Sequence, residues 1–255
     1  MTIQTDNQVS IYEEPVVERI RKFIRLESLF TKFYHFREKD LNMENYIALE
    51  ALCEIYEILT RSDIKSELIR EIENQNTVFK KIQNIPDTDS NKLTSILEKQ
   101  KLLIDMLHNT KTNYLEFLTK DVLFKTVHKN FRSPIQPASV DFWLSRDIIW
   151  RSNILSIWLE PLIFIKKSID FILEVIRKSG NFQDKFAEKG FYIEKLDPKK
   201  NILLVRITLT TDLYYFPQVS VGKQRINIMF MTKDETNNFI QYQEDVPFLL
   251  TLCSI

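Results

Sequence analysis

The side chains that most often carry out chemistry in proteins are scarce and far apart in this sequence. Its three histidines are His35, His108 and His128, and its two cysteines are Cys53 and Cys253. Neither set has the close spacing of a zinc motif, such as two histidines one helical turn apart or a C-x-x-C pair. Cys53 lies in an apolar helical pattern, so we expect a core residue rather than a nucleophile. The sequence therefore contains no specific sign of an enzyme.

Phosphate-binding loops are excluded by the scarcity of glycine. The chain has 3 glycines among 255 residues, and Gly180, Gly190 and Gly222 are widely separated. Both G-x-G-x-x-G and G-x-x-x-x-G-K-[ST] need glycines a few residues apart, because the backbone must approach the phosphate closely. So few glycines also favour long helices over tight turns.

The composition predicts a folded protein of a reducing compartment. The 35 Lys and Arg residues balance 35 Asp and Glu residues, and 44% of the chain is hydrophobic. Such a chain suits one large domain or two small ones, and two cysteines without a framework favour the cytosol. The polar N-terminus lacks a signal segment, and the apolar stretch at 154–165 is interrupted by Glu160 and Pro161. We therefore expect no membrane partner.

The neutral total conceals two charged helical segments of opposite sign. Residues 15–39 contain seven Lys or Arg and three Asp or Glu. Helical spacing brings Arg21, Arg25 and Lys32 within about 40° of one another, which forms a basic stripe. The next segment is acidic, with no Lys or Arg between residues 40 and 60. The two stripes either are solvated, pair with each other at little gain in stability, or mark a surface for an acidic partner.

A second set of cations lies on predicted strands near the C-terminus. Alternation with period two places Arg206 on the face opposite its apolar neighbours, and it does the same for Lys223 and Arg225. If both strands pack their apolar faces on the helices, the three cations crowd the outer face of one sheet. Crowded cations cost stability unless acids or a ligand neutralise them, so this patch suits an acidic peptide or a phosphate chain.

Helical periodicity supplies the elements that would position these residues. Apolar residues at three- and four-residue spacing predict helices at about 15–39, 43–59, 62–82, 91–107 and 113–130. Pro15 is predicted to start the first helix and Ser62 to cap the third. Residues 83–92 and 131–141 are predicted to be irregular. Residues 143–179 are predicted as a helix that is long or broken near Pro161, with Gly180 as its C-cap.

Strand patterns prevail after about residue 190. Predicted strands lie at 190–193, 202–209, 225–230 and 248–253, with a turn at 197–201 and a short N-terminal strand at 9–12. The predicted fold class is α+β: a mainly α-helical body with a smaller antiparallel β-sheet domain whose strands are mostly C-terminal. We expect residues 14–182 to form the helical body and residues 8–13 with 188–254 to form the β-strand domain, together as one compact unit.

An ordered set of short motifs resembles one known protein family. The set begins with Tyr12-Glu13-x-Pro15 and Arg25-Leu26-Glu27, and continues with Arg61-x-x-Ile64-Lys65-x-Glu67-Leu68 and the helical segment 162–177. Its most specific members are Gly190-Phe191-Tyr192, the run 203–207, the run 216–220, and Lys223-x-Arg225-Ile226-x-Ile228-x-Phe230-Met231. Over residues 12–232 the chain resembles the ZapD family of bacterial cell division proteins.

The resemblance implies a function as well as a fold. It implies a symmetric homodimer, with contacts through the helical body, that binds the acidic C-terminal tail of FtsZ, crosslinks and bundles FtsZ protofilaments, and stabilises the Z-ring at midcell in the cytoplasm. It implies no catalysis, no cofactor and no metal. Basic residues of the family are associated with bundling, so the expected partner-binding residues are Arg25, Arg61, Lys65, Arg206, Lys223 and Arg225.

The chain also departs from the family pattern. The segment 133–153 is shorter than in relatives and lacks their Cys-Ser-Phe-Asp-Leu-Pro run, of which Ser139 and Asp141 remain, and Val122 occupies a position that is basic in the family. An alternative hypothesis is a nucleic-acid-binding protein that uses the same basic patches. Overall neutrality and the acidic second helix argue against it, so no nucleic acid is expected. A hydrolase that uses a histidine or a cysteine is the least supported hypothesis.

Overall fold

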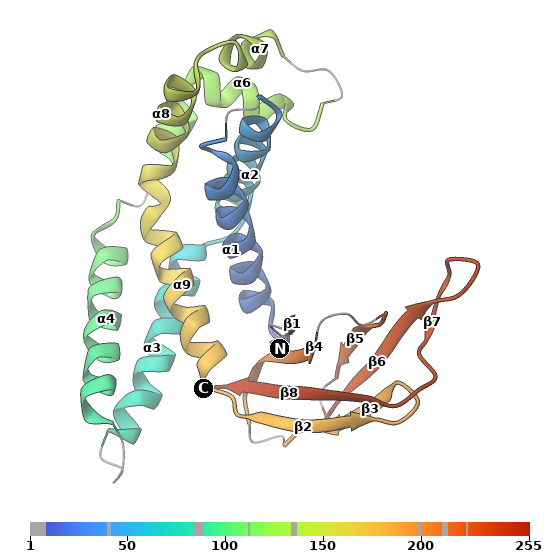
Figure 1. The fold of residues 1–255 in the computed structure, drawn as a ribbon. Helices are drawn as coiled ribbons and strands as arrows, with labels where there is room; N and C mark the ends of the chain where they lie inside the picture. The colour runs from blue at the N-terminus through green and yellow to red at the C-terminus, as the bar shows by residue number, and fades with distance from the viewer. Residues whose placement is uncertain are drawn as a thin grey trace, which may run out of the picture. The chain divides into compact units, whose positions relative to one another are not determined.

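The fold confirms the predicted α+β class. The computed structural model describes residues 9–39, 42–83, 89–111, 113–133, 137–197, 200–210, 214–222 and 224–255. Helices fill the chain between residues 18 and 178, and strands follow them, apart from one strand near the N-terminus (Figure 1). The chain divides into two compact units. The helical unit is Lys22–Leu173, and the sheet unit comprises the described residues up to Arg21 and from Glu174 onward. These boundaries fall inside two helices, whereas the sequence-based boundaries lie at residues 14 and 182.

Nine α-helices and one short 3-10 helix occur among the described residues. They are α1 (Glu18–Phe36), α2 (Asn42–Arg61), α3 (Ile64–Ile82), α4 (Ser90–Asn109), α5 (Glu116–Lys120), α6 (Val122–Asn130), α7 (Ala138–Leu144), α8 (Ile148–Leu159), η1 (Glu160–Leu162) and α9 (Ile163–Lys178). Aromatic side chains of α1 lie in the core, since Phe23, Phe30 and Phe33 are 0% exposed. The apolar spacing that predicts a helix at about 15–39 thus corresponds to a buried helix face.

Three local predictions about helix ends were wrong. Pro15 does not start a helix: it is the last residue of strand β1 (Val9–Pro15), where it pairs with Leu204. The side chain of Asp63, rather than Ser62, caps α3 by accepting a hydrogen bond from the Ser66 amide at 3.1 Å. The single helix predicted at 113–130 is two helices, because Asp121 ends α5 and caps α6. At Pro15, strand pairing overrides the local signal for a helix start. At α3 and α6, an aspartate side chain caps the first turn and so sets where the helix begins.

The strands form two four-stranded antiparallel sheets instead of the single sheet predicted. They are β1, β2 (Phe182–Ala187), β3 (Phe191–Lys195), β4 (Ile202–Thr210), β5 (Phe216–Val221), β6 (Arg225–Lys233), β7 (Phe239–Gln241) and β8 (Val246–Ser254). Sheet A has the order β1-β4-β8-β2, and sheet B has the order β3-β6-β5 with β7 also paired to β6. The strands β2, β5 and β7 were not predicted, because they are short and mix polar with apolar residues.

The two sheets pack face to face around one hydrophobic core. Sheet A contributes Val205 and Ile207 of β4, sheet B contributes Ile226 and Ile228 of β6, and all four are at most 1% exposed. Arg206 and Arg225 alternate with these residues, so each points away from the core. They lie on different sheets, on opposite outer faces of the sandwich. The prediction that one sheet face carries both cations was therefore wrong.

Two glycines are required by close backbone packing. Gly190 has φ = 71° in the tight turn between β2 and β3, and a Cβ there would lie 2.2 Å from the Tyr242 carbonyl oxygen. Gly180 was predicted as the C-cap of the last helix, and it lacks the positive φ found among the described glycines at Gly190. A Cβ on Gly180 would lie 2.6 Å from Thr251 Cγ2, so glycine is needed there for close approach.

One helical stretch, Ile148–Lys178, is long and apolar enough to cross a membrane by length and composition alone. Its most apolar 18-residue window has a mean hydropathy of 1.4, and 39% of that window is buried inside the protein. A buried core helix meets the same criterion, and η1 divides the stretch at Pro161, as predicted. The sequence analysis counted uninterrupted apolar runs and therefore expected no membrane-spanning helix. Mean hydropathy averages over the polar residues that interrupt such runs, so this stretch meets the criterion.

Candidate functional site

The outer face of sheet B carries an open groove with a volume of about 380 Å³. The strand β6 forms its floor, and β3 and β5 form its sides, because both pair with β6 along this segment. The groove is lined by Phe191, Ile193, Gln218, Val219, Ser220, Arg225, Asn227 and Met229. Among the described lining residues, apolar, amide and hydroxyl side chains surround one guanidinium, and none is acidic. Such a surface suits an extended peptide that carries both apolar and acidic side chains.

Arg225 is the cation at this groove, and it has no acidic partner among the described residues. It lies directly opposite Lys195 in the register between β3 and β6, so the two cations share the outer face. Like charges opposite each other on neighbouring strands destabilise a sheet. An anionic ligand would remove that repulsion, so the arrangement favours binding of an acidic group. Lys195 was missed in the sequence analysis, because only the strand register shows that it faces Arg225.

Arg206, in contrast to Arg225, pairs with an acidic side chain of the fold. Its side chain is 16% exposed, and its Nε donates a 2.9 Å hydrogen bond to the Glu13 carboxylate. Arg177 donates two hydrogen bonds to the same carboxylate, at 2.7 and 2.8 Å. Burial opposes ionisation of Glu13, but the hydrogen bonds and charges of Arg177 and Arg206 prevail, so its pKa lies below the ordinary value. This network ties β1 to β4 and to the end of α9.

Arg25 and Lys65 also have partners within the helical unit. Arg25 of α1 is 3.3 Å from Glu54 of α2, so the basic stripe and the acidic helix pair at this point. The side chain of Arg25 is 61% exposed, and such a pair contributes little to stability. Lys65 Nζ donates a 2.7 Å hydrogen bond to the Thr110 carbonyl at the C-terminus of α4. A cation is favourable there because the helix end carries partial negative charge.

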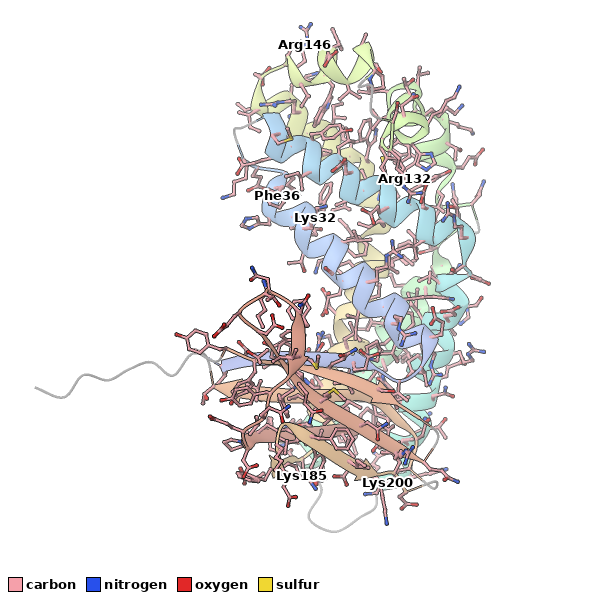
Figure 2. All side chains as sticks on the ribbon, turned by 90° about the vertical axis from the view of Figure 1, so that its right-hand side faces the viewer. Lys32, Phe36, Arg132, Arg146, Lys185 and Lys200 are labelled. Carbon is pink, nitrogen blue, oxygen red and sulfur yellow. The ribbon has the colours of Figure 1, made fainter. Side chains whose placement is uncertain are left out.

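Arg61 belongs to a cationic cluster around Glu57 that the sequence analysis did not anticipate. Arg132 Nη2 lies 2.6 Å from the Glu57 carboxylate, Arg61 Nη2 lies 3.4 Å from it, and His128 Nε2 lies 3.8 Å from it. Figure 2 labels Arg132 on the helical unit. Both arginines are more than half exposed, whereas Glu57 is 14% exposed. Two guanidinium groups therefore share one carboxylate, and donors remain free for a further anion.

The imidazole of His128 is an uncharged member of this cluster at neutral pH. Burial is the main cause that lowers its pKa below 6.5, and the charges of Arg132 and Arg61 lower it further, although Glu57 raises it. The ring stacks on Phe124 and Phe131 with centroid distances of 6.0 and 5.8 Å. His128 thus packs as an aromatic residue, consistent with the absence of a ligand motif around it.

The thiols are poorly suited to nucleophilic chemistry. Cys53 and Cys253 are free and 0% exposed, and burial raises the pKa of both, that of Cys253 to about 11. Little thiolate forms at neutral pH under these conditions. Within the described ranges, no group of three or more His, Cys, Asp or Glu side chains could hold a metal ion.

The expected binding residues therefore have different environments. Arg25, Arg61 and Lys65 lie in the helical unit, and Arg206 and Arg225 lie in the sheet unit. Lys223 lies outside the described residues, so its predicted role stays a prediction. Only Arg225 combines an exposed charge, a groove and the absence of an acidic partner in the described part of the chain.

Comparison with known proteins shows one consistent similarity. The family model ZapD, described as a cell division protein, matches residues 24–229. A cell division protein ZapD of Methylococcus capsulatus is 31% identical over 252 residues, which cover 97% of this chain and 98% of that protein. The ZapD of Nitrosomonas eutropha is 30% identical over 249 residues (96% and 99%). The ZapD of Coxiella burnetii is 27% identical over 254 residues (96% and 97%).

Proposed function

Because this chain belongs to the ZapD family of cell division proteins, we propose that it acts in division by binding the acidic C-terminal tail of FtsZ. In this proposal the protein is not an enzyme. It works as a homodimer in the cytoplasm, where it crosslinks FtsZ protofilaments and stabilises the Z-ring at midcell. The observation that carries the proposal is the guanidinium of Arg225, which has no acidic partner among the described residues and lies in a groove whose described lining is free of acidic side chains.

The groove supports the recognition step. An acidic side chain of the tail would bind Arg225 and Lys195, whose mutual repulsion it relieves. Apolar side chains of the tail would contact Phe191 and Ile193, which are 37% and 45% exposed. Binding of this kind is weakened by salt, because the contributing charges are exposed.

Crosslinking follows from two such grooves on one particle. A single groove binds one flexible tail weakly, whereas a filament offers many tails and a two-fold dimer offers two grooves. The second tail then binds at a high effective concentration, so modest sites give tight bundling. The cluster of Arg61, Arg132 and Glu57 supplies a further anion-binding surface on the helical unit.

Charge reversal at Arg225 tests the proposal. We expect Arg225→Glu to weaken co-sedimentation with FtsZ filaments roughly tenfold, the loss of one charge-assisted hydrogen bond, while thermal stability stays nearly unchanged. Arg70→Glu is the matched control, because Arg70 is exposed on α3, which belongs to the helical unit, whereas the groove belongs to the sheet unit. Full co-sedimentation by the double variant Arg61→Glu and Arg225→Glu would contradict the proposed function.

A further inference from the structure

Aromatic side chains gather at one end of sheet B, where β5 and β7 flank the last residues of β6 (Figure 1). They line an open hollow with a volume of about 410 Å³. Five of its seven described lining residues are aromatic, namely Tyr12, Tyr214, Tyr215, Phe216 and Phe239. The hollow is separate from the groove that contains Arg225, because the two have no described lining residue in common.

Two of these rings are exposed to a degree that packing within the fold does not explain. Tyr214 is 91% exposed and Phe239 is 59% exposed. The ring of Phe239 packs edge-on against that of Phe216, with the centroids 5.3 Å apart, so it is held in place beside the hollow. Large exposed rings that lie together mark a binding surface rather than a part of the core.

The inner wall of the hollow is held by the core of the sandwich. Tyr12 of β1 and Tyr215 both pack against that core. The ring centroid of Tyr215 lies 5.8 Å from that of Phe230 and 4.7 Å from that of Tyr242. The wall is therefore formed before any ligand binds, and little binding free energy is lost in ordering it.

The hollow also offers hydrogen-bond donors that the fold does not use. Within the described part of the chain, no hydrogen-bond partner faces the hydroxyl groups of Tyr12, Tyr214 and Tyr215. Each hydroxyl can donate to a carbonyl oxygen of a ligand. The hydroxyl of Thr232, by contrast, donates a 2.7 Å hydrogen bond to the Tyr214 carbonyl, which fixes the backbone of Tyr214 at the rim.

One cation, Lys233, is the only charged residue among the described lining residues. Its Nζ lies 5.6 Å from the centroid of the Phe239 ring, and it has no acidic partner in the ranges that the structure describes. The carboxylate of the neighbouring Asp234 accepts hydrogen bonds from Thr236 and Asn238 instead. An acidic group of a ligand would therefore complement the charge of the hollow.

From these rings, hydroxyl groups and the single cation, we propose that the hollow binds a proline-rich peptide segment in the polyproline II conformation, with an acidic residue beside the prolines. Aromatic-lined grooves are the surfaces on which such segments dock. A polyproline II backbone has no internal hydrogen bonds, so its carbonyl groups are free to accept from the tyrosine hydroxyls. Lys233 binds the acidic residue. This site goes beyond the proposed function, because it gives the protein a second class of peptide partner.

Two other classes of ligand fit the hollow less well. At Met231 the strand β6 pairs with both β5 and β7, so it offers no free edge to a peptide in β conformation, and Pro217 of β5 lacks an N–H group. The bases of a nucleic acid would stack on the rings. Its phosphates, however, require several cations, and Lys233 is the only one among the described lining residues.

A labelled proline peptide tests the proposal on the full chain. The probe is a fluorescein-labelled peptide of about nine residues, proline throughout apart from a terminal pair of glutamates, and the comparison peptide has alanine in place of each proline. We expect saturable binding of the proline peptide in fluorescence anisotropy, and binding of the alanine peptide that is about tenfold weaker or more. Equal affinity for the two peptides would overturn the proposal.

Substitutions in the hollow locate the site. Tyr214→Ala removes an exposed ring and is expected to weaken binding about tenfold, whereas Tyr214→Phe keeps the ring and is expected to weaken it about threefold. Lys233→Met should remove most of the salt dependence of binding. Phe182→Ala is the matched control, since Phe182 is 66% exposed on β2 and does not line the hollow. It should bind like the wild type, and circular dichroism checks that each variant is folded.

The outcomes separate this inference from the proposed function. We expect Arg225→Glu to weaken co-sedimentation with FtsZ filaments and to leave binding of the proline peptide unchanged. Wild-type affinity for the proline peptide in both Tyr214→Ala and Phe239→Ala would overturn the inference and leave the proposed function standing. Binding of a labelled oligothymidine that Tyr214→Ala abolishes, without binding of the proline peptide, would show a nucleic-acid site and would also overturn it.

Discussion

Glu13 lies directly opposite Arg206 on the neighbouring strands β1 and β4, 193 residues apart in sequence. The carboxylate is 16% exposed and also accepts two hydrogen bonds from Arg177 at the end of α9. This partly buried carboxylate accepts hydrogen bonds from two guanidinium groups and so links β1 to β4 and to the end of α9. Removing the carboxylate takes a charged hydrogen-bond acceptor away from two partly buried guanidinium groups.

We therefore expect Glu13→Gln to lower the free energy of unfolding by about 2 kcal/mol near pH 7, between the values for exposed and for fully buried pairs that lose one partner. Because the folded-state pKa of Glu13 is lowered from 4.5, its contribution is complete above the unfolded-state value and is lost as the pH falls through the folded-state value. The difference between wild type and variant should thus shrink in acid. Urea denaturation at several pH values measures it.

Glu14→Gln is the control for this prediction. Glu14 is the next residue on β1, and its partner Arg21 is 54% exposed at 3.3 Å. Such an exposed pair contributes about 0.5 kcal/mol or less. A loss as large as that of Glu13→Gln, or a Glu13→Gln effect that persists unchanged at low pH, would contradict the role assigned to the pair of Glu13 and Arg206.

The same pair shows how far the sequence could predict this structure. Alternation along β4 correctly placed Arg206 opposite Val205 and Ile207, because the period of a strand is a local property. It could not show that β4 and β6 belong to different sheets, since that depends on which strands pair. Pro15 illustrates the same limit. Its local signal for a helix start is real, but pairing of β1 with β4 keeps it in a strand.

The long helices were predictable because apolar spacing extends over several turns in each of them. The groove on sheet B was predictable only in part. Arg225 stood out as a cation on an alternating strand, whereas its neighbour Lys195 depends on register, and Arg132 depends on how α2 and α6 pack around Glu57. Arg206 has the same sequence pattern as Arg225. Only the position of Glu13 shows that Arg206 pairs with an acid, whereas Arg225 has no acidic partner among the described residues.

The cluster around Glu57 predicts a pH dependence of stability. The folded-state pKa of His128 is lowered from 6.5, chiefly by burial, so the unfolded chain binds a proton more readily than the folded protein. Stability should therefore rise with pH through this window and fall as the pH drops below about 6.5. We expect His128→Gln to flatten this part of the profile of thermal midpoint against pH.

His35→Gln is the control, because His35 is exposed near the end of α1. It should leave the slope of the profile as in the wild type. Equal slopes for the wild type and His128→Gln would show that groups other than His128 produce the pH dependence.

We predict that adding a single methyl group at Gly190 strongly lowers the stability of the fold. Its φ of 71° is rarely adopted by other residues, and a Cβ would lie 2.2 Å from the Tyr242 carbonyl oxygen. We expect Gly190→Ala to lower the free energy of unfolding by about 2 kcal/mol or more. Gly222→Ala is the matched control, since its nearest atom, the Arg225 carbonyl oxygen, would be at 3.5 Å. Similar losses for both variants in thermal denaturation would contradict the packing argument.

A substitution at Lys195, which faces Arg225, is expected to change binding and stability in opposite directions, so it separates the two effects most clearly. Lys195→Glu replaces a repulsive cross-strand pair by an attractive one, so we expect stability to be unchanged or to rise by about 0.5 kcal/mol. The new carboxylate occupies Arg225, so binding of a fluorescent peptide with the FtsZ tail sequence should weaken by about tenfold or more. Lys200→Glu, exposed elsewhere on the sheet unit, should bind like the wild type. Wild-type affinity in Lys195→Glu would mean that the tail binds outside this groove, and lower affinity in Lys200→Glu would mean that only net charge matters.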